Sequence, residues 1–189
     1  GTGIAKRSPE YLQQKMLQGH AVIAFSPDGT WVGFCYIESW SHGAYVANSG
    51  LIVSLAFRNT GVARSIKQRI FQLSRSKYPK AKIFGLTTGL AVMRINSDLG
   101  YKPVTYSELT QEESFWNGCK SCTNYQILMS KERTNCLCTA MLFVPPDLEE
   151  NPGLTRKDLA NPNVDRHNEK LHKRTSQLTN THEESSISI

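Results

Sequence analysis

The sequence predicts an α+β protein built on one mixed, mostly antiparallel sheet flanked by helices. Short apolar segments recur between turn signals, as is typical of strands. The first two of these segments form a strong hairpin pattern, and two stretches with helical spacing of apolar residues separate the later ones. This order of elements favours an α+β fold over a purely parallel α/β fold.

The first expected elements are a helix and a hairpin. Residues 8–19 begin with Ser-Pro and carry a glutamate in the first turn, which is typical of a helix start. "HAVIAFS" at 20–26 and "WVGFCYIESW" at 31–40 flank the turn "PDGT", so they predict two antiparallel strands. A third strand is expected within 44–57.

A long amphipathic helix is expected at 61–77, because Val62, Ile66, Ile70 and Leu73 fall on one helical face. A cysteine-bearing insertion should separate the last strand from the rest of the sheet. The remaining expected elements are a strand at 79–88, a helix at 89–100, a strand at 101–109, a helical turn at 110–118 and a strand at 135–145.

Composition divides the chain into a domain at 1–146 and a polar tail at 147–189. The tail carries 6 Lys/Arg and 8 Asp/Glu, whereas the domain carries 16 and 8. The tail is poor in aromatic residues, so we expect it to be disordered. The basic domain suits a polyanionic partner, whether a nucleotide-like cofactor, a nucleic acid or an anionic membrane surface.

The sequence carries no membrane or export signal. No apolar run approaches the ~20 residues that a membrane-spanning helix needs, and the N-terminus lacks a basic-then-apolar pattern. Five cysteines without a secretory signal suggest a reducing compartment. We therefore expect a cytoplasmic protein with no membrane contact.

The turn between the third strand and the long helix has the features of a phosphate-binding turn. In "FRNTGVARSIKQ", Arg58, Gly61 and Ala63 follow an apolar strand and open the helix. Small residues leave the unpaired N–H groups of a helix start open to an anion. The spacing alone favours an ordinary strand-to-helix turn, and neither a dinucleotide fingerprint nor a Walker loop is present.

This stretch resembles the acetyl-CoA-binding motif of the GNAT superfamily, the Gcn5-related N-acetyltransferases. "VSLAFRNTGVARSIKQRIF" at 53–71 is similar to the family's Arg/Gln-x-x-Gly-x-Gly/Ala motif, and "KIFGLTTGLAVMRINSDLGYKPV" at 82–104 to the strand and helix that follow it. The resemblance spans about 8–108 and a final strand near 136–144. Within the family, the chain looks like bacterial stand-alone amino-acid or arginine-pathway enzymes. Members normally have a strand and a helix before the helix at 8–19, so we expect an N-terminally truncated version.

The resemblance implies direct transfer of an acyl group from acetyl-CoA, or a larger acyl-CoA, to a primary amine. Pantetheine would lie between the strands at 51–57 and 82–88, and a main-chain N–H near Val53 would polarise the thioester. The residues expected to bind the cofactor are Val53, Leu55, Arg58, Asn59, Thr60, Gly61, Val62, Ala63 and Arg64.

An attacking amine must lose a proton, so the site needs a base. Glu38 and His42 are the candidates, although each also reads as a plain surface or turn residue. Many family members place a tyrosine in the later helix as the general acid, and Asn96 stands at that position here. Asn96 is therefore expected to orient water or substrate, or to have a structural role.

Four later cysteines form a separate pattern, Cys-x2-Cys followed by Cys-x-Cys. Four thiolates from two short loops suit a closed, structural zinc site. Free thiols and disulfides are the alternatives. The cysteines concerned are Cys119, Cys122, Cys136 and Cys138.

The sequence therefore predicts an acyl-CoA-dependent N-acyltransferase with a small-molecule amine acceptor, such as an amino acid. The alternative is a non-catalytic basic module that contains zinc and binds nucleic acid or protein. A GNAT scaffold that binds CoA but has lost activity is a third interpretation. We do not expect nucleic acid as the main partner, and a homodimer is left open.

Overall fold

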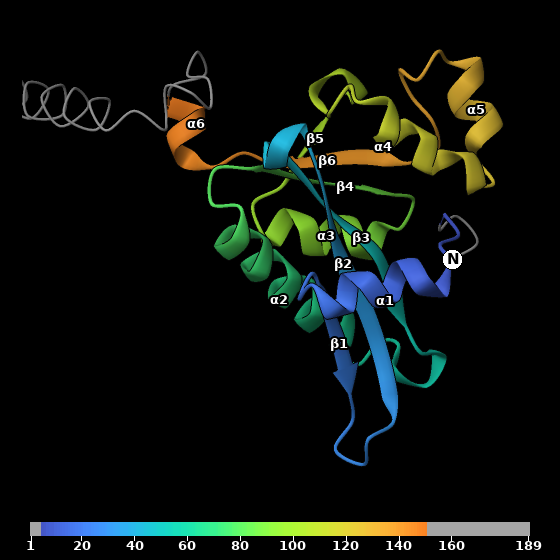
Figure 1. The fold of residues 1–189 in the computed structure, drawn as a ribbon, viewed down its shortest axis with the longest axis vertical. Helices are drawn as coiled ribbons and strands as arrows, with labels where there is room; N and C mark the ends of the chain where they lie inside the picture. The colour runs from blue at the N-terminus through green and yellow to red at the C-terminus, as the bar shows by residue number, and fades with distance from the viewer. Residues whose placement is uncertain (1–4, 151–189) are drawn as a thin grey trace, which may run out of the picture. The chain divides into compact units, whose positions relative to one another are not determined.

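The computed structural model describes residues 5–150, which contain a six-stranded sheet in the order β1-β2-β3-β4-β6-β5 (Figure 1). The pairing of β3 with β4 is parallel and the other pairings are antiparallel. The predicted α+β class and mostly antiparallel sheet are confirmed. The strands are β1 (Ala21–Phe25), β2 (Trp31–Trp40), β3 (Tyr45–Val53), β4 (Lys82–Thr87), β5 (Lys102–Val104) and β6 (Thr139–Phe143). The helices are α1 (Pro9–Leu17), α2 (Val62–Lys77), α3 (Leu90–Asp98), α4 (Glu113–Asn117), α5 (Tyr125–Ser130) and α6 (Pro146–Glu150).

By its internal contacts the chain divides into two units, Gly1–Pro146 and Asp147–Ile189. The expected disorder of the tail falls almost entirely on residues outside the described range. Within residues 5–150, every helix is too short or too polar to span a bilayer.

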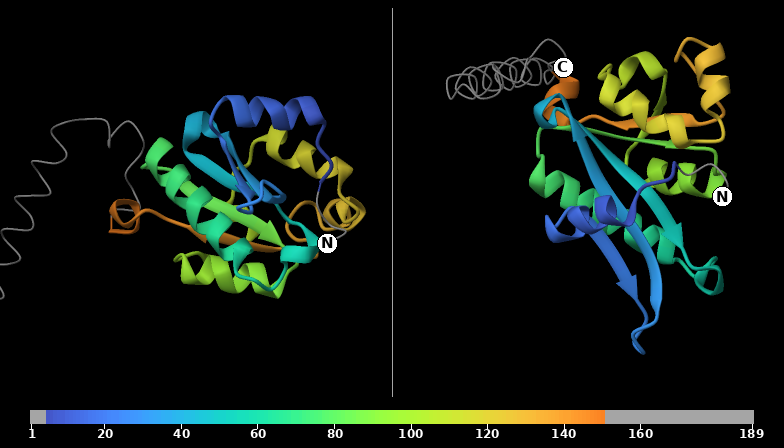
Figure 2. Two further views of the ribbon diagram at one scale, coloured as in Figure 1. Left: turned by 90° about the horizontal axis from the view of Figure 1, so that it is seen from below. Right: turned by 45° about the vertical axis from the view of Figure 1, so that its right-hand side comes forward.

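Helices cover both faces of the sheet (Figure 2). Successive strand residues point to opposite faces, so Val46 and Ile83 pack in the cluster under α2 and α3. Their neighbours Ala47 and Phe84 pack in the cluster under α4 and α5. Helix α1 lies on the same face as α4 and α5, where the ring of Tyr11 meets that of Tyr36 edge-on at 6.1 Å.

The long helix α2 begins and ends as its pattern predicts. Ile66 and Ile70 are buried against β2 and β3. Burying side chains of this size stabilises the fold by roughly 1.5–3 kcal/mol each. The apolar spacing that predicted the helix is therefore also what fastens it to the sheet.

Two later segments differ from the expectation. The predicted strand at 101–109 is only the short edge strand β5, where Pro103 is tolerated although it lacks an N–H. A 3₁₀ turn (Tyr106–Glu108) follows, with Thr105 and Glu108 forming a capping box. In the insertion, α5 had no counterpart in the prediction, and its Leu128 is buried in the core.

Candidate acyl-transfer site

The sheet opens between its two parallel strands. β3 and β4 pair only at Tyr45↔Lys82, Val46↔Ile83 and Ala47↔Phe84. Beyond these pairs both strands continue without pairing to each other, up to Val53 and Thr87 (Figure 1). A cavity of about 600 Å³ occupies this gap. Its lining combines Asn48 and Lys67 from the α2 face with Glu38 and Phe115 from the α4 face, so the cavity passes through the sheet.

A β-bulge in β3 forms one wall of this cavity. Phe34 pairs with Ile52 and Tyr36 with Ser49, so Gly50 and Leu51 together oppose the single residue between them on β2. At a bulge, main-chain N–H and C=O groups leave the hydrogen-bonded pairing of the strands and point in a new direction. Gly50 and Leu51 both line the cavity, whereas Val53, the residue expected to face the thioester, does not. The Val53 carbonyl accepts a hydrogen bond from Arg58 Nε at 3.3 Å.

The start of α2 is open to solvent. Gly61 precedes the helix with φ 90°, a left-handed conformation that suits glycine, and no side chain caps the helix. Within residues 5–150, the N–H groups of Val62, Ala63 and Arg64 have no protein acceptor. These amides and the helix dipole together form an anion-binding surface.

Of the residues expected to bind the cofactor, Arg58 alone lines the described part of the cavity. The residues that follow it lie outside the lining and are exposed in the turn and half-buried at Val62 and Ala63. Leu55 is exposed and also outside the lining. Arg64 contacts Asp98 of α3 at 2.6 Å on the surface. The turn residues outside the lining are Asn59, Thr60, Gly61, Val62 and Ala63.

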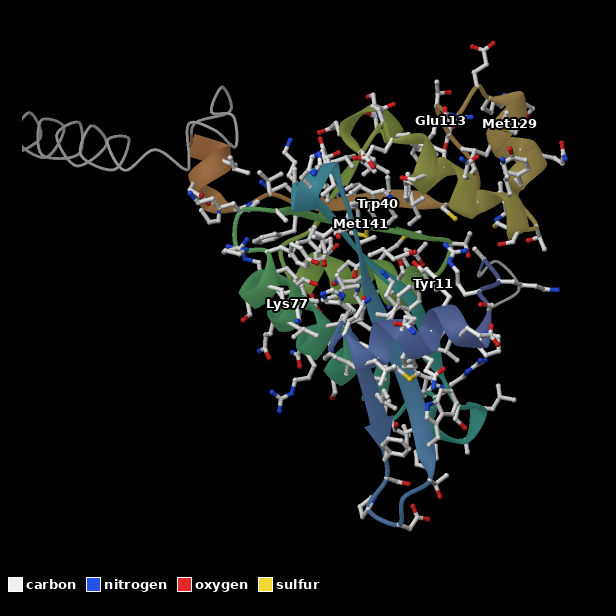
Figure 3. All side chains as sticks on the ribbon, viewed as in Figure 1. Tyr11, Trp40, Lys77, Glu113, Met129 and Met141 are labelled. Carbon is white, nitrogen blue, oxygen red and sulfur yellow. The ribbon has the colours of Figure 1, made fainter. Side chains whose placement is uncertain are left out.

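Among the described residues, Glu38 is the one that brings a carboxylate to the cavity lining. It is 8% exposed, and its Oε1 accepts a hydrogen bond of 2.5 Å from the Tyr11 hydroxyl. Tyr11 lies on α1, which covers this face of the sheet (Figure 3). Burial, together with the Glu38 carboxylate, raises the pKa of Tyr11 well above its usual range, so the phenol remains a donor. The Arg7 guanidinium lies 3.8 Å from the same oxygen.

The other two catalytic candidates have different positions. His42 lies in the 3₁₀ turn Ser41–Gly43 with φ 54°, and it does not line the cavity. Asn96 is 1% exposed and does line it. Its Nδ2 contacts the Met141 sulfur at 3.7 Å. Its Oδ1 is the only buried side-chain N or O atom in the described residues that lacks a partner.

Sequence reasoning did not select Arg7, Tyr11 or Lys67 as site residues. Lys67 follows the phosphate-binding turn as one of several basic residues of α2, yet it is buried in the cavity wall. Its position was a usable signal, because it shares the buried stripe of α2 with Ile70 and Ser74. Arg7 and Tyr11 come from the N-terminal segment, where no motif marks them.

The four clustered cysteines line the cavity. The Cys136 sulfur lies 2.8 Å from the Tyr106 hydroxyl. Burial and the neighbouring thiols raise the pKa of Cys119 to about 11 and that of Cys138 to about 12. Among the described residues, no three metal-binding side chains converge to hold an ion, and no disulfide joins these cysteines. The expected zinc site therefore has no support in the structure.

Comparisons with known proteins bear on the fold. No family model and no curated protein matches this sequence. N-acetylglutamate synthase from Neisseria gonorrhoeae, complexed with coenzyme A and N-acetyl-glutamate, matches with a TM-score of 0.54 and 17% identity. That match covers 76% of this chain but only 29% of the other.

Two further structures match over more of their own length. A Mycobacterium tuberculosis protein in complex with CoA has a TM-score of 0.55 and 16% identity, covering 76% of this chain and 86% of that one. A GNAT superfamily phosphinothricin acetyltransferase from Sinorhizobium meliloti, in complex with AcCoA, has a TM-score of 0.51 and 10% identity, covering 77% and 75%. With its parted strands and bulge, the chain has the fold of the GNAT acetyltransferases.

Proposed function

We propose that the protein is an acyl-CoA-dependent N-acyltransferase that moves an acetyl group directly to the primary amine of a small molecule. The parting of β3 and β4 around a through-sheet cavity, beside the uncapped start of α2, carries this proposal. The solved neighbours in complex with CoA or AcCoA support the choice of donor.

The donor would enter from the α2 side. The amides at the start of α2 and the Arg58 guanidinium would hold the diphosphate, since both present N–H donors to an anion. Pantetheine would then occupy the gap between β3 and β4. The thioester carbonyl would meet the bulge, where the Leu51 N–H replaces Val53 as the expected oxyanion donor.

Glu38 would act as the general base. A protonated amine cannot attack a carbonyl carbon, and a carboxylate on the cavity wall can accept its proton, directly or through one water. Tyr11 holds the carboxylate in place with its hydrogen bond of 2.5 Å. A positioned base contributes about 10²–10⁴-fold to such a reaction.

The acceptor end suits an amino acid. Arg7 places a cation beside Glu38, with its Nη2 3.8 Å from the carboxylate oxygen. An α-amino acid carries a carboxylate close to its amine. Arg7 would bind that carboxylate while Glu38 receives the proton of the amine. The neighbour from Neisseria gonorrhoeae, solved with N-acetyl-glutamate, supports this class of acceptor.

Isothermal titration of the full chain with acetyl-CoA tests the proposal. We expect saturable binding that Arg58→Ala weakens by about tenfold or more, because a charge-assisted hydrogen bond is lost. Arg69→Ala is the matched control, since Arg69 is an exposed residue of α2 outside the cavity lining. Absence of acetyl-CoA binding by the unaltered chain would refute the function. Thiol detection of released CoA, with amino acids as acceptors, then identifies the substrate.

A further inference from the structure

Lys67 is a buried cation that the steps above do not use. It is 2% exposed, yet it lines the cavity. Its ammonium lies 5.4 Å from the centre of the Tyr101 ring. Burial lowers the pKa of Lys67, because a desolvated ammonium is less stable than a neutral amine. The side chain of an ordinary surface lysine would instead extend to solvent.

The groups around Lys67 are neutral. Burial raises the pKa of the Cys35 thiol to about 11, and this thiol donates to the Ser49 carbonyl at 3.2 Å. The Tyr101 hydroxyl donates to Asn48 Oδ1 at 3.0 Å. Within residues 5–150, no ion pair or hydrogen bond engages the Lys67 ammonium. The ammonium faces the cavity, where an anionic atom of a ligand is the partner that would stabilise its charge.

Lys67 and Glu38 lie on opposite faces of the opened sheet. Lys67 belongs to α2, which packs on one face, whereas Glu38 is held by Tyr11 from α1 on the other. The bulge at Gly50 and Leu51 belongs to the sheet that separates these faces and lines the same cavity. An acyl carbon held at the bulge would therefore have the base on one side and the ammonium on the other.

We propose that Lys67 is a catalytic residue that protonates the CoA sulfur as the thioester breaks. This inference rests on the proposed function. The amine nitrogen forms a bond to the acyl carbon and gives one proton to Glu38. The carbon–sulfur bond then breaks, its electron pair passes to sulfur, and the Lys67 ammonium transfers a proton to give CoA thiol. Glu38 then releases its proton to water and the neutral lysine regains one from water, both through the cavity, which restores the site.

The ultraviolet absorbance of the CoA thiolate, followed against pH in the protein–CoA complex, tests the ammonium–sulfur contact without any acceptor. We expect at least tenfold more thiolate at a given pH in the complex than in free CoA. Lys67→Met should abolish this gain. Lys77→Met should keep it, because Lys77 is an exposed residue at the end of the same helix, outside the lining (Figure 3). An equal thiolate fraction in the unaltered protein and Lys67→Met would overturn the inference, although CoA binding by both would leave the proposed function standing. Failure of CoA to bind at all would overturn both.

Turnover measurements separate proton donation from charge alone. We expect Lys67→Met to lower kcat by about 10²–10⁴-fold, with little change in the KM for acetyl-CoA, and to remove the fall in rate at high pH. Lys67→Arg should restore the bound thiolate but not kcat, because a guanidinium does not release its proton. If Lys67→Met impaired succinyl-CoA but not acetyl-CoA, the ammonium would instead bind an acyl carboxylate, and the inference would be wrong.

Discussion

Replacing Gly50 with alanine should cost far more than a typical glycine replacement. Gly50 has φ 65°, and a Cβ there would lie 2.4 Å from Tyr36 Cε1. The left-handed backbone alone costs a residue with a Cβ about 1–2 kcal/mol. The clash adds about 1–3 kcal/mol, because Tyr36 is 3% exposed and stacks on Phe34, so its ring has little room to move. We therefore expect Gly50→Ala to reduce the free energy of unfolding by about 2–5 kcal/mol.

Urea unfolding of Gly50→Ala and Gly29→Ala separates the cost of the left-handed backbone from the cost of the clash with Tyr36. Gly29 has φ 85° and nothing within 4 Å of the added Cβ, so this variant carries the backbone cost without a clash. The difference between the variants should be about 1–3 kcal/mol. The same shift of Tyr36 should weaken acetyl-CoA binding in Gly50→Ala only. Equal unfolding free energies for the two variants would refute the close packing of the bulge against Tyr36.

Three further predictions follow from the buried polar groups. Glu38→Gln should lower kcat by about 10²–10⁴-fold and leave acetyl-CoA binding by calorimetry unchanged, whereas an unchanged kcat would exclude Glu38 as the base. Ser74→Ala should cost about 1–3 kcal/mol in urea unfolding, because Asn48 Nδ2, now 2.7 Å from Ser74 Oγ, would lose its buried acceptor. The raised pKa of Cys35 means that the folded state holds this proton more tightly than the unfolded state does. The Cys35 proton therefore contributes fully to the free energy of unfolding below about pH 9. This contribution falls by about 2 kcal/mol as the pH rises toward 11. Unfolding at pH 8 and 10.5 should reveal this loss, and Cys35→Ala should reduce it.

The fold was predictable where the sequence periodicity is strong. The strand at 31–40 and the helix at 61–77 match β2 and α2 within one residue. The short helix α5 was not foreseen, because Leu128 and its neighbours gain their apolar environment from strands distant in the sequence. The early end of β5 at Val104 likewise depends on pairing with β6, which local sequence does not encode.

The candidate site was predictable only where it depends on main-chain geometry. Gly61 and the apolar strand before it mark the open helix start. Glu38 was proposed from its position near the end of the second hairpin strand, and it lines the cavity, whereas His42 does not. The helical spacing that Lys67 shares with Ile70 indicates that it faces the core, but the sequence does not show that this part of the core opens into a cavity. The four cysteines do come together, but their side chains are not arranged as ligands.

Because β3 and β4 pair only briefly, the sheet consists of two half-sheets, β1-β2-β3 and β4-β6-β5, which are joined by three residue pairs. Beyond Ala47 and Phe84 the two strands no longer pair, so the main-chain N–H and C=O groups that border the gap have no partner strand across it. A bound molecule that has amide groups can form hydrogen bonds to both strands and so connect the two half-sheets. Occupancy would then stiffen the protein, and amide hydrogens along Asn48–Val53 would exchange more slowly once the gap is filled.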